Sequence, residues 1–311
     1  MKCLVLGGCG FMGSHVAERL LRDGHVVRIF DKLNVDEVNI APFRRDVGLL
    51  TGDFTNASDV EAALKDTDIV FHFIGTTLPQ SSIENPAYDI ETNVLASVRM
   101  LDACVKRGVK RVIFSSSGGT VYGIPQRTPI PEDHPNNPIC SYGITKLAVE
   151  KYISLYHRLY GLDYRIVRFA NPYGPRQKTH ASQGAVAVFL GNALENRPIT
   201  IWGDGTVQRD YIYIDDAVDA CVRLAMGDYA PGIYNVGSGR ATALNELVET
   251  IKRVTGKSLA VKYAPARKID VPVNVLDITK VSAAMKWGPS TKLADGIRAT
   301  WQWLLNSRPP Q

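Results

Sequence analysis

Short apolar runs rich in β-branched residues alternate with amphipathic segments along the first half of the chain. The apolar runs predict strands at residues 3–6, 26–30, 69–73, 112–114 and 164–167. Apolar positions with a helical period predict helices at residues 12–22, 57–64, 88–106 and 142–160. Because strands and helices alternate, we expect right-handed crossovers and a parallel sheet.

This alternation ends after Asn171, where proline and glycine separate shorter elements. We therefore predict an α/β protein in which residues 1–170 form a Rossmann-like, doubly wound parallel sheet. Residues 171–311 mainly form a smaller α/β lobe that binds substrate. Further strands are predicted at residues 210–214 and 234–236, so segments from about 210–240 are expected to return to the first domain.

Composition narrows the class of protein. The 311 residues are 45% hydrophobic and 22% charged, which is enough to bury a full core. The net charge of +5 is dispersed, so we expect no nucleic-acid partner, and a mild basic excess suits an anionic substrate. No apolar stretch approaches the ~20 residues that cross a bilayer, and no export leader is recognisable, so we expect no membrane association.

The five cysteines are widely spaced, with no CxxC pair and no histidine at a zinc-binding spacing. We expect no metal site and reduced thiols in a cytoplasmic protein. These cysteines are Cys3, Cys9, Cys104, Cys140 and Cys221.

Gly7, Gly10 and Gly13 lie between the first predicted strand and the first predicted helix. In a dinucleotide-binding fold, glycines at such positions allow a tight turn, a close approach of the backbone to a pyrophosphate, and close packing of helix on sheet. The free N–H groups of the helix N-terminus would then face the phosphates. Glycines that serve only a tight turn are the alternative.

Two acidic residues extend this hypothesis. Asp31 ends the second strand about 20 residues further on, where a carboxylate can bind the adenosine ribose and would repel a 2′-phosphate. NAD is therefore favoured over NADP, although a residue that only ends the strand is the alternative. Asp53, in a Thr-Gly-Asp-Phe sequence after a third strand, suits a loop cap and a bond to the adenine amino group equally well.

Tyr142 and Lys146 are spaced i and i+4 at the start of a predicted helix, so their side chains project from one face. A free phenol titrates near pH ~10 and is a poor base at neutrality, but a neighbouring ammonium and an oxidised nicotinamide would both lower its pKa. Such a pair also occurs by chance on many helices. The three serines at 115–117, at the carboxyl end of a buried strand, favour the catalytic interpretation because ligands bind at that edge of the sheet.

His72 is the other titratable residue that invites a catalytic role. It lies within the apolar sequence Phe-His-Phe-Ile on a predicted buried strand. We interpret it as a core histidine and exclude it from the catalytic set.

Taken together, these motifs resemble the extended short-chain dehydrogenase/reductase family, and within it the UDP-glucose 4-epimerases and their relatives. The resemblance covers nearly the whole chain. It rests on the glycine loop, Asp31 and Asp53, Ser-Ser-Ser-Gly-Gly-Thr-Val-Tyr-Gly at 115–123, Tyr-Gly-Ile-Thr-Lys at 142–146, Asn-Pro-Tyr-Gly-Pro at 171–175 and Arg-Asp-Tyr-Ile-Tyr-Ile-Asp-Asp at 209–216.

The resemblance implies an isomerase with tightly bound NAD. Tyr142 would take the O4 proton of a UDP-hexose while the C4 hydride passes to NAD, and the 4-keto sugar would turn over before the hydride returns to its other face. Ser117 would bond O4, although the extra glycine in Gly118-Gly119 leaves Ser116 as a substitute. The residues implied to bind NAD are Gly7, Gly10, Phe11, Met12, Gly13, Asp31, Asp53, Phe54, Asn93, Tyr142 and Lys146.

The resemblance also implies a substrate site and a homodimer. Besides Ser117 and Tyr142, the residues implied to bind the UDP-sugar are Asn171, Trp202, Arg209, Arg267 and Asp270. Arginines suit this role because they bind phosphate with two parallel hydrogen bonds. The helices at 88–106 and 142–160 resemble those that pair across the dimer interface of relatives, although burial within one chain fits their periodicity too.

Departures from the family pattern bear on specificity. Gly118, Gly119 and Thr120 stand where nucleotide-sugar dehydratases and decarboxylases carry additional acid and base groups, which disfavours elimination chemistry. Asn274 stands where some relatives have a bulky tyrosine, so N-acetylated UDP-hexoses are candidate substrates alongside UDP-glucose and UDP-galactose. The alternatives are an NAD(P)-dependent reductase of nucleotide 4-keto-sugars and a non-catalytic protein that senses dinucleotides.

Overall fold

The computed structural model describes residues 1–180, 184–266 and 271–307, and the chain divides into two compact units. The first unit comprises residues 1–123, 135–168 and 218–234. The second comprises residues 124–134, 169–217 and the chain from residue 235 onward. The predicted residues Arg267 and Asp270 lie outside the described residues.

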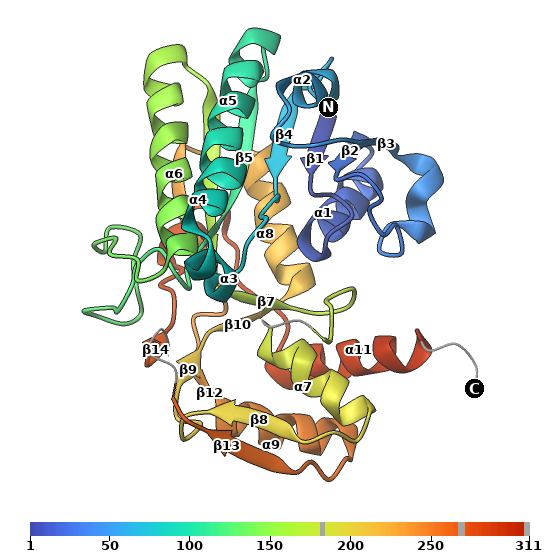
Figure 1. Ribbon diagram of the computed structural model, residues 1–311, viewed down its shortest axis with the longest axis vertical. Helices are drawn as coiled ribbons and strands as arrows, with labels where there is room; N and C mark the ends of the chain where they lie inside the picture. Colours follow the sequence, from blue (N-terminus) through green and yellow to red (C-terminus); the bar gives the residue numbers. More distant parts are fainter. Residues whose placement is uncertain (181–183, 267–270, 308–311) are drawn as a thin grey trace. The chain divides into compact units, whose positions relative to one another are not determined.

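A seven-stranded sheet organises the first unit (Figure 1), in the order β11-β6-β5-β4-β1-β2-β3. The pairs β3-β2, β2-β1, β1-β4 and β4-β5 are parallel. The predicted Rossmann-like, doubly wound sheet is therefore confirmed. The strands are β1 (Lys2–Leu6), β2 (Val26–Asp31), β3 (Gly48–Thr51), β4 (Ile69–His72), β5 (Arg111–Ser117), β6 (Asp163–Phe169) and β11 (Gly232–Val236).

The order of the strands reverses beside β1. From β1 the chain goes to β2 and β3 on one side, then crosses to β4 and continues to β5 and β6 on the other. Ligands of open α/β sheets bind at the carboxyl ends of the strands, at the point where the strand order reverses. This places the loops that follow β1 and β4 at the expected cofactor site.

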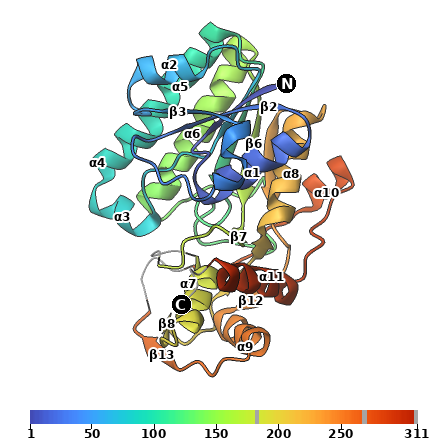
Figure 2. The same ribbon diagram turned by 90° about the vertical axis from the view of Figure 1, so that its right-hand side faces the viewer.

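Helices cover both faces of this sheet. Figure 2 shows α5 and α6 on one side of it and α1 and α8 on the other. The helical segments are α1 (Phe11–Arg22), η1 (Ala41–Asp46), α2 (Ala57–Ala63), α3 (Pro79–Glu84), α4 (Pro86–Asp89), η2 (Ile90–Leu95), α5 (Ala96–Arg107), α6 (Ser141–Tyr160) and α8 (Ile214–Met226). The helix predicted at 88–106 is thus interrupted, because η2 is a π-helical segment.

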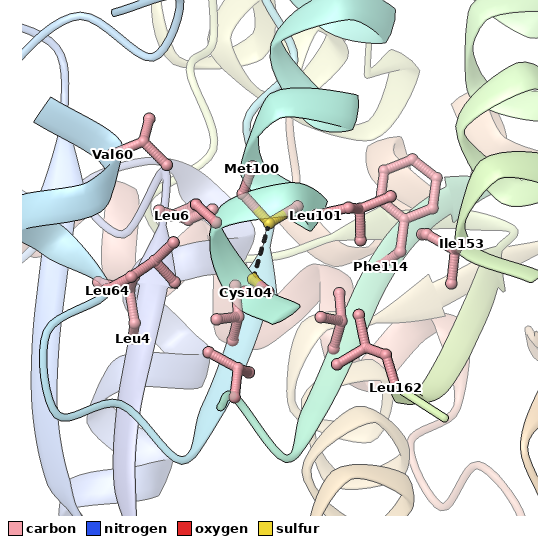
Figure 3. Close-up of a cluster of buried hydrophobic side chains, with 14 of the residues drawn as sticks. Leu4, Leu6, Val60, Leu64, Met100, Leu101, Cys104, Phe114, Ile153 and Leu162 are labelled. Atoms are coloured by element: carbon pink, nitrogen blue, oxygen red, sulfur yellow. Dashed lines mark hydrogen bonds between the residues drawn. The ribbon is translucent and has the colours of Figure 1, made fainter. Parts of the chain in front are cut away.

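Alternation of side chains along the strands explains the core of this unit. Leu4 and Leu6 of β1 face one side of the sheet, where they join a buried cluster with Met100 and Cys104 of α5 and Ile153 of α6 (Figure 3). The thiol of Cys104 donates a hydrogen bond to the sulfur of Met100 at 3.3 Å. The apolar periodicity of these two helices and of the strands therefore specifies the core layer on this face of the sheet.

The second unit is built from short strands and helices, as the proline and glycine pattern predicts. Its sheets are small: β7 pairs with β10, β9 lies between β12 and β14, and β8 pairs with β13. The strands are β7 (Asn171–Tyr173), β8 (Ile199–Trp202), β9 (Gln208–Arg209), β10 (Tyr211–Tyr213), β12 (Thr242–Ala243), β13 (Val261–Ala264) and β14 (Val273–Asn274). The helices are α7 (Ala185–Leu194), α9 (Leu244–Thr255), α10 (Thr279–Met285) and α11 (Leu293–Asn306).

Candidate active site

The glycine loop follows β1 and leads into α1. Gly7 has a φ of +79°, which favours glycine, and a Cβ at Gly13 would collide with the carbonyl oxygen of Gly7. Gly10 is the N-cap of α1, and as a glycine it offers no side chain to accept the first-turn N–H groups. The loop therefore has the backbone conformation and the helix N-terminus that an anionic group such as a pyrophosphate needs.

Asp31, at the end of β2, is half-buried against this loop. Its Oδ2 accepts a hydrogen bond from the backbone N–H of Cys9 at 2.9 Å, and its Oδ1 accepts one from the N–H of Lys32 at 2.9 Å. An ionised carboxylate has about four lone-pair sites, so two further donors can be accommodated. Asp31 thus fixes the loop and keeps the capacity to bind ribose hydroxyls.

Asp53 is exposed and caps its own loop. Its Oδ1 accepts hydrogen bonds from the N–H and the hydroxyl of Thr55, both at 2.8 Å, and the backbone bond from Thr55 is the main reason that the pKa of Asp53 is lowered. The loop-capping interpretation is therefore correct as far as Oδ1 is concerned. Phe54, the next residue, is buried with its ring 5.1 Å from that of His72.

Asn93, in the π-helical segment η2, is tied to the loop that follows β4. Its Oδ1 accepts a hydrogen bond from the N–H of Thr76 at 3.1 Å, and its Nδ2 donates to Thr76 Oγ1 at 2.8 Å. The same Nδ2 donates to the Asp89 carboxylate at 2.9 Å. Asn93 therefore lies at the carboxyl edge of the sheet, where the cofactor is expected.

Tyr142 and Lys146 occupy the first turns of α6, and Lys146 is buried. The Lys146 ammonium donates to the Ser115 carbonyl at 2.9 Å and lies 4.9 Å from the centre of the Phe114 ring and 5.7 Å from that of Tyr142. Burial lowers the pKa of Lys146 to about 8, against the opposing effects of Asp89 and Glu150. At pH 7 the side chain remains a cation close to the phenol.

The pKa of Tyr142 differs from the expectation. Burial raises it to about 12, with smaller contributions in the same direction from Cys140 and Asp89. We predicted that Lys146 would lower it. The reason for the difference is that Lys146 binds the Ser115 carbonyl and approaches the face of the ring, while the loss of water around a phenolate acts strongly in the opposite sense.

The structure distinguishes the two candidate serines. Ser116 is buried and its hydroxyl donates to the carboxylate of Glu150, which also forms an ion pair with Arg168. Ser117 is half-buried at the very end of β5. The hydroxyl of Ser116 is thus held in the interior, whereas Ser117 is less buried and lies at the carboxyl end of β5.

His72 is a core residue, in agreement with the sequence interpretation. It is buried at the end of β4, its Nε2 lies 2.9 Å from the hydroxyl of Ser97, and its ring packs against Phe54 and Phe114. Burial, with a smaller effect of Lys146, lowers its pKa to about 3. The ring is therefore neutral throughout the physiological range.

Three predicted substrate residues lie in the described part of the second unit. Asn171 begins β7, and its amide donates to the Asp210 carbonyl at 3.0 Å. Arg209 in β9 donates from Nη1 to the Val271 carbonyl at 2.6 Å, and in the sheet register it pairs with Asn274, which is buried. Trp202 ends β8 and is exposed.

Asp89 was not singled out by the sequence analysis, yet it is fully buried beside the first turn of α6. Its Oδ2 accepts a hydrogen bond from the hydroxyl of Ser141 at 2.8 Å. Acidic residues are common near the N-terminus of any helix. An aspartate soon after Asn85-Pro86 therefore gave no sign in the sequence that its side chain would be buried beside α6.

Within residues 1–180, 184–266 and 271–307, no three or more His, Cys, Asp or Glu side chains are arranged to hold a metal ion. In the same ranges, no helix combines the length and the apolar character that a bilayer span requires.

Comparisons with known proteins identify the family. The family described as "NAD dependent epimerase/dehydratase family" matches residues 3–237. The UDP-glucose 4-epimerase of Mycolicibacterium smegmatis is 35% identical over 98% of this chain and 99% of its own. The structure of UDP-glucose 4-epimerase from Thermotoga maritima with UDP-glucose has a TM-score of 0.93 and 36% identity, with 99% of each chain covered.

A further solved structure is similar over the whole chain. It is the UDP-glucose 4-epimerase of Thermus thermophilus in complex with NAD, with a TM-score of 0.93, 33% identity, and coverage of 99% of this chain and 100% of that one. The family match and this extent of similarity make the assignment plain: the chain belongs to the NAD-dependent epimerase/dehydratase family.

Proposed function

We propose that this protein is an NAD-dependent nucleotide-sugar 4-epimerase that interconverts UDP-glucose and UDP-galactose. The observation that carries the proposal is the arrangement at the start of α6, where Tyr142 lies beside the buried cation Lys146, which binds the carboxyl end of β5. Proteins named UDP-glucose 4-epimerase that match the whole chain, in complexes with UDP-glucose and with NAD, support it.

The residues of the first unit fit NAD. A side chain at Gly13 would block the close approach of α1 to the loop, and Asp31 suits a ribose without a 2′-phosphate. We propose that the glycine loop with Phe11 and Met12 binds the pyrophosphate, and that Asp31, Asp53 and Phe54 contact the adenosine. Asn93, Tyr142 and Lys146 are proposed to contact the nicotinamide half. Bound NAD supplies a reversible hydride acceptor, whose oxidised ring is cationic.

In the proposed reaction, the phenolate oxygen of Tyr142 accepts the proton of the sugar O4 as the C4–H bond breaks and the C4=O bond forms. Lys146 stabilises the phenolate by its charge, and Ser117 donates a hydrogen bond to O4. After the 4-keto sugar turns its other face, the hydride returns to C4 and Tyr142 gives the proton back to O4. Atoms and electrons balance without an external oxidant.

We propose that the first unit binds NAD and that the second binds the UDP group through Asn171, Trp202, Arg209, Arg267 and Asp270. Asn274 is buried in β14, next to Arg209 in the register of the sheet, so this residue remains our proposed determinant of the 2-substituent.

The decisive experiment follows conversion of UDP-galactose to UDP-glucose by freshly purified protein without added cofactor. We expect turnover with a catalytic amount of bound NAD, because each cycle restores it. A 4-keto-sugar reductase would instead consume NADH in stoichiometric amounts, and a dinucleotide sensor would show no turnover. Either result would contradict the proposal.

We further propose that the protein is a cytoplasmic homodimer. All five cysteines are buried free thiols, which suits a reducing compartment. On α6, the large apolar residues Ile144, Tyr152, Leu155 and Leu159 are exposed at helical spacing, and Tyr88, Ile90 and Leu95 are exposed on α4 and η2. Exposed apolar side chains gathered on α6 and on the neighbouring segments α4 and η2 suit the pairing of two copies.

The variant Leu155→Glu tests the dimer. We expect light scattering to give about twice 34.2 kDa for the natural protein and 34.2 kDa for the variant, because a carboxylate in the apolar interface loses its water without gaining a partner. The control is Leu33→Glu, since Leu33 is also an exposed leucine but lies in the loop after β2. A natural protein of 34.2 kDa in solution would refute the dimer.

A further inference from the structure

Asp89, the last residue of α4, is a buried carboxylate surrounded by neutral donors. Its side chain has no exposed surface. It accepts hydrogen bonds from Thr77 Oγ1 at 2.6 Å and Ser141 Oγ at 2.8 Å, as well as from Asn93 and, at 3.3 Å, from Thr145 Oγ1. A buried charge without a directly bonded cation is costly in free energy, so a role beyond packing is indicated.

Two of these donors flank Tyr142 on α6. Ser141 precedes Tyr142, and Thr145 lies on the same turn of the helix. The N-cap residue Cys140 makes no side-chain capping bond, and the N–H of Tyr142 donates to Ser82 Oγ of α3 at 2.9 Å. The first turn of the catalytic helix is therefore anchored by α3 and α4, with the Asp89 charge close to the positive end of the helix dipole.

The other two donors belong to the cofactor side of the network. Thr77 lies in the loop after β4, and Asn93 connects that loop to η2 through Thr76. Asn93 Nδ2 also donates to the Asp89 carbonyl at 3.1 Å, which helps to satisfy the backbone of the π-helical segment. One carboxylate thus joins the loop after β4, the π-helical segment and the start of α6.

The charge of Asp89 also reaches both members of the catalytic pair. It opposes ionisation of Tyr142, together with Cys140, and it favours the protonated form of Lys146, together with Glu150. His72 of β4 also faces Lys146, but it is neutral. Removal of the Asp89 charge is therefore expected to lower the pKa of Tyr142 and that of Lys146.

We propose that Asp89 is a positioning residue, whose buried carboxylate anchors the first turn of α6 through Ser141 and Thr145, the residues that precede Tyr142 and Lys146, and so places a negative charge near this pair. This proposal rests on the proposed function of Tyr142 and Lys146. The same carboxylate thus holds the position of the Tyr142 phenol and is the charge whose effect on Tyr142 and Lys146 the following experiments measure.

A direct test is titration of Tyr142 by NMR in full-length protein labelled at tyrosine Cζ, with Tyr142→Phe to assign the signal. In Asp89→Asn we expect the midpoint for Tyr142 to fall by at least about half a pH unit. Asp216→Asn is the matched control, because Asp216 is a buried carboxylate that accepts bonds from Ser290 and Thr291 in the second unit. An unchanged midpoint in Asp89→Asn would overturn the proposed role of this charge.

Turnover gives the second readout. Both limbs of the pH profile of kcat should move to lower pH in Asp89→Asn, because the acidic limb reports loss of the Tyr142 proton and the basic limb reports loss of the Lys146 proton. We expect kcat at its optimum to fall about tenfold while KM for UDP-galactose changes little. A normal kcat and pH profile would refute the proposal, whereas inactivity of the natural protein would refute the proposed function instead.

Should Asp89→Asn fail to fold, Ser141→Ala answers the same question with a smaller change. It removes one anchoring hydroxyl from the carboxylate and leaves the charge in place. We expect kcat to fall at least about threefold without a change in the pH limits, since only the anchor is weakened. A folded Ser141→Ala variant with unchanged kcat would overturn the anchoring role.

Discussion

The variant Tyr142→Phe is expected to lose about 10³-fold in kcat for the conversion of UDP-galactose to UDP-glucose. The substitution removes one oxygen atom, which is the proposed acceptor and donor of the O4 proton. The α6 backbone contacts of this residue, from its N–H to Ser82 and from Thr145 to its carbonyl, remain available. The variant should therefore fold normally and keep its bound NAD.

The electrostatics of the site determine the pH range in which Tyr142 can act as a base. With a pKa of about 12, Tyr142 would be ionised in only about one molecule in 10⁵ at pH 7. Lys146 and the cationic ring of bound NAD must stabilise the phenolate for it to act as a base near neutrality. We therefore expect activity to fall as the pH drops through the lowered pKa of the cofactor-bound form, since the base is then protonated.

Tyr156→Phe is the matched control for this variant. Tyr156 lies on the same helix and is buried, with its hydroxyl donating to Asp102. Loss of that hydrogen bond should cost about 1 kcal/mol of stability and leave kcat unchanged. If Tyr142→Phe turned over at the natural rate, or if both variants lost activity equally, Tyr142 would not be the proton-transfer residue.

Glu150→Ala is expected to destabilise the protein by about 3–5 kcal/mol, the largest stability effect that the structure predicts. The Glu150 carboxylate binds Arg168 through two hydrogen bonds, of 2.9 Å and 2.5 Å, and both side chains are buried. Removal of Glu150 leaves a guanidinium cation in the interior without its counter-charge. Calorimetry should show a fall of at least about 6 °C in Tm.

Two further variants isolate the cause. In the double variant Glu150→Met with Arg168→Met, both charges are absent, so most of the lost stability should return. In Asp295→Ala, which breaks the exposed ion pair of Asp295 with Arg298, the change should stay below about 1 kcal/mol. Equal losses of stability in Glu150→Ala and Asp295→Ala would show that the buried ion pair of Glu150 with Arg168 contributes no more to stability than an exposed one.

The central strands and helices of the fold could be predicted from the sequence because their apolar residues follow simple periodicities. Apolar runs gave β1, β2 and β4 to within a residue or so, and α6 begins one residue before its predicted start. The edge strand β3 is less regular, since most of its side chains are exposed and no apolar pattern marks its limits. The π-helical segment was also not foreseen, because it depends on contacts of Asn93 and Thr92 that lie outside any periodic rule.

The candidate site was accessible in part. Spacing alone places Tyr142 and Lys146 on one helical face, and glycine geometry explains the loop after β1. The burial of these charged residues could not be predicted from the sequence, because Arg168 and Asp89 belong to residue types that usually lie at the surface. Their interior positions depend on partners far away in the sequence, such as Ser141 for Asp89, and no local pattern encodes these pairings.

The chain order of the seven-stranded sheet has a consequence for biosynthesis. Residues 218–234, which supply the last part of α8 and most of β11, are translated after the whole of segment 169–217. The nascent first unit therefore emerges from the ribosome with β6 as an open edge, which is exposed to pairing with other chains. The sheet of the first unit is complete only once β11 has been made, so we expect a nonsense mutation shortly after residue 170 to yield a fragment that aggregates and not a smaller dinucleotide-binding protein.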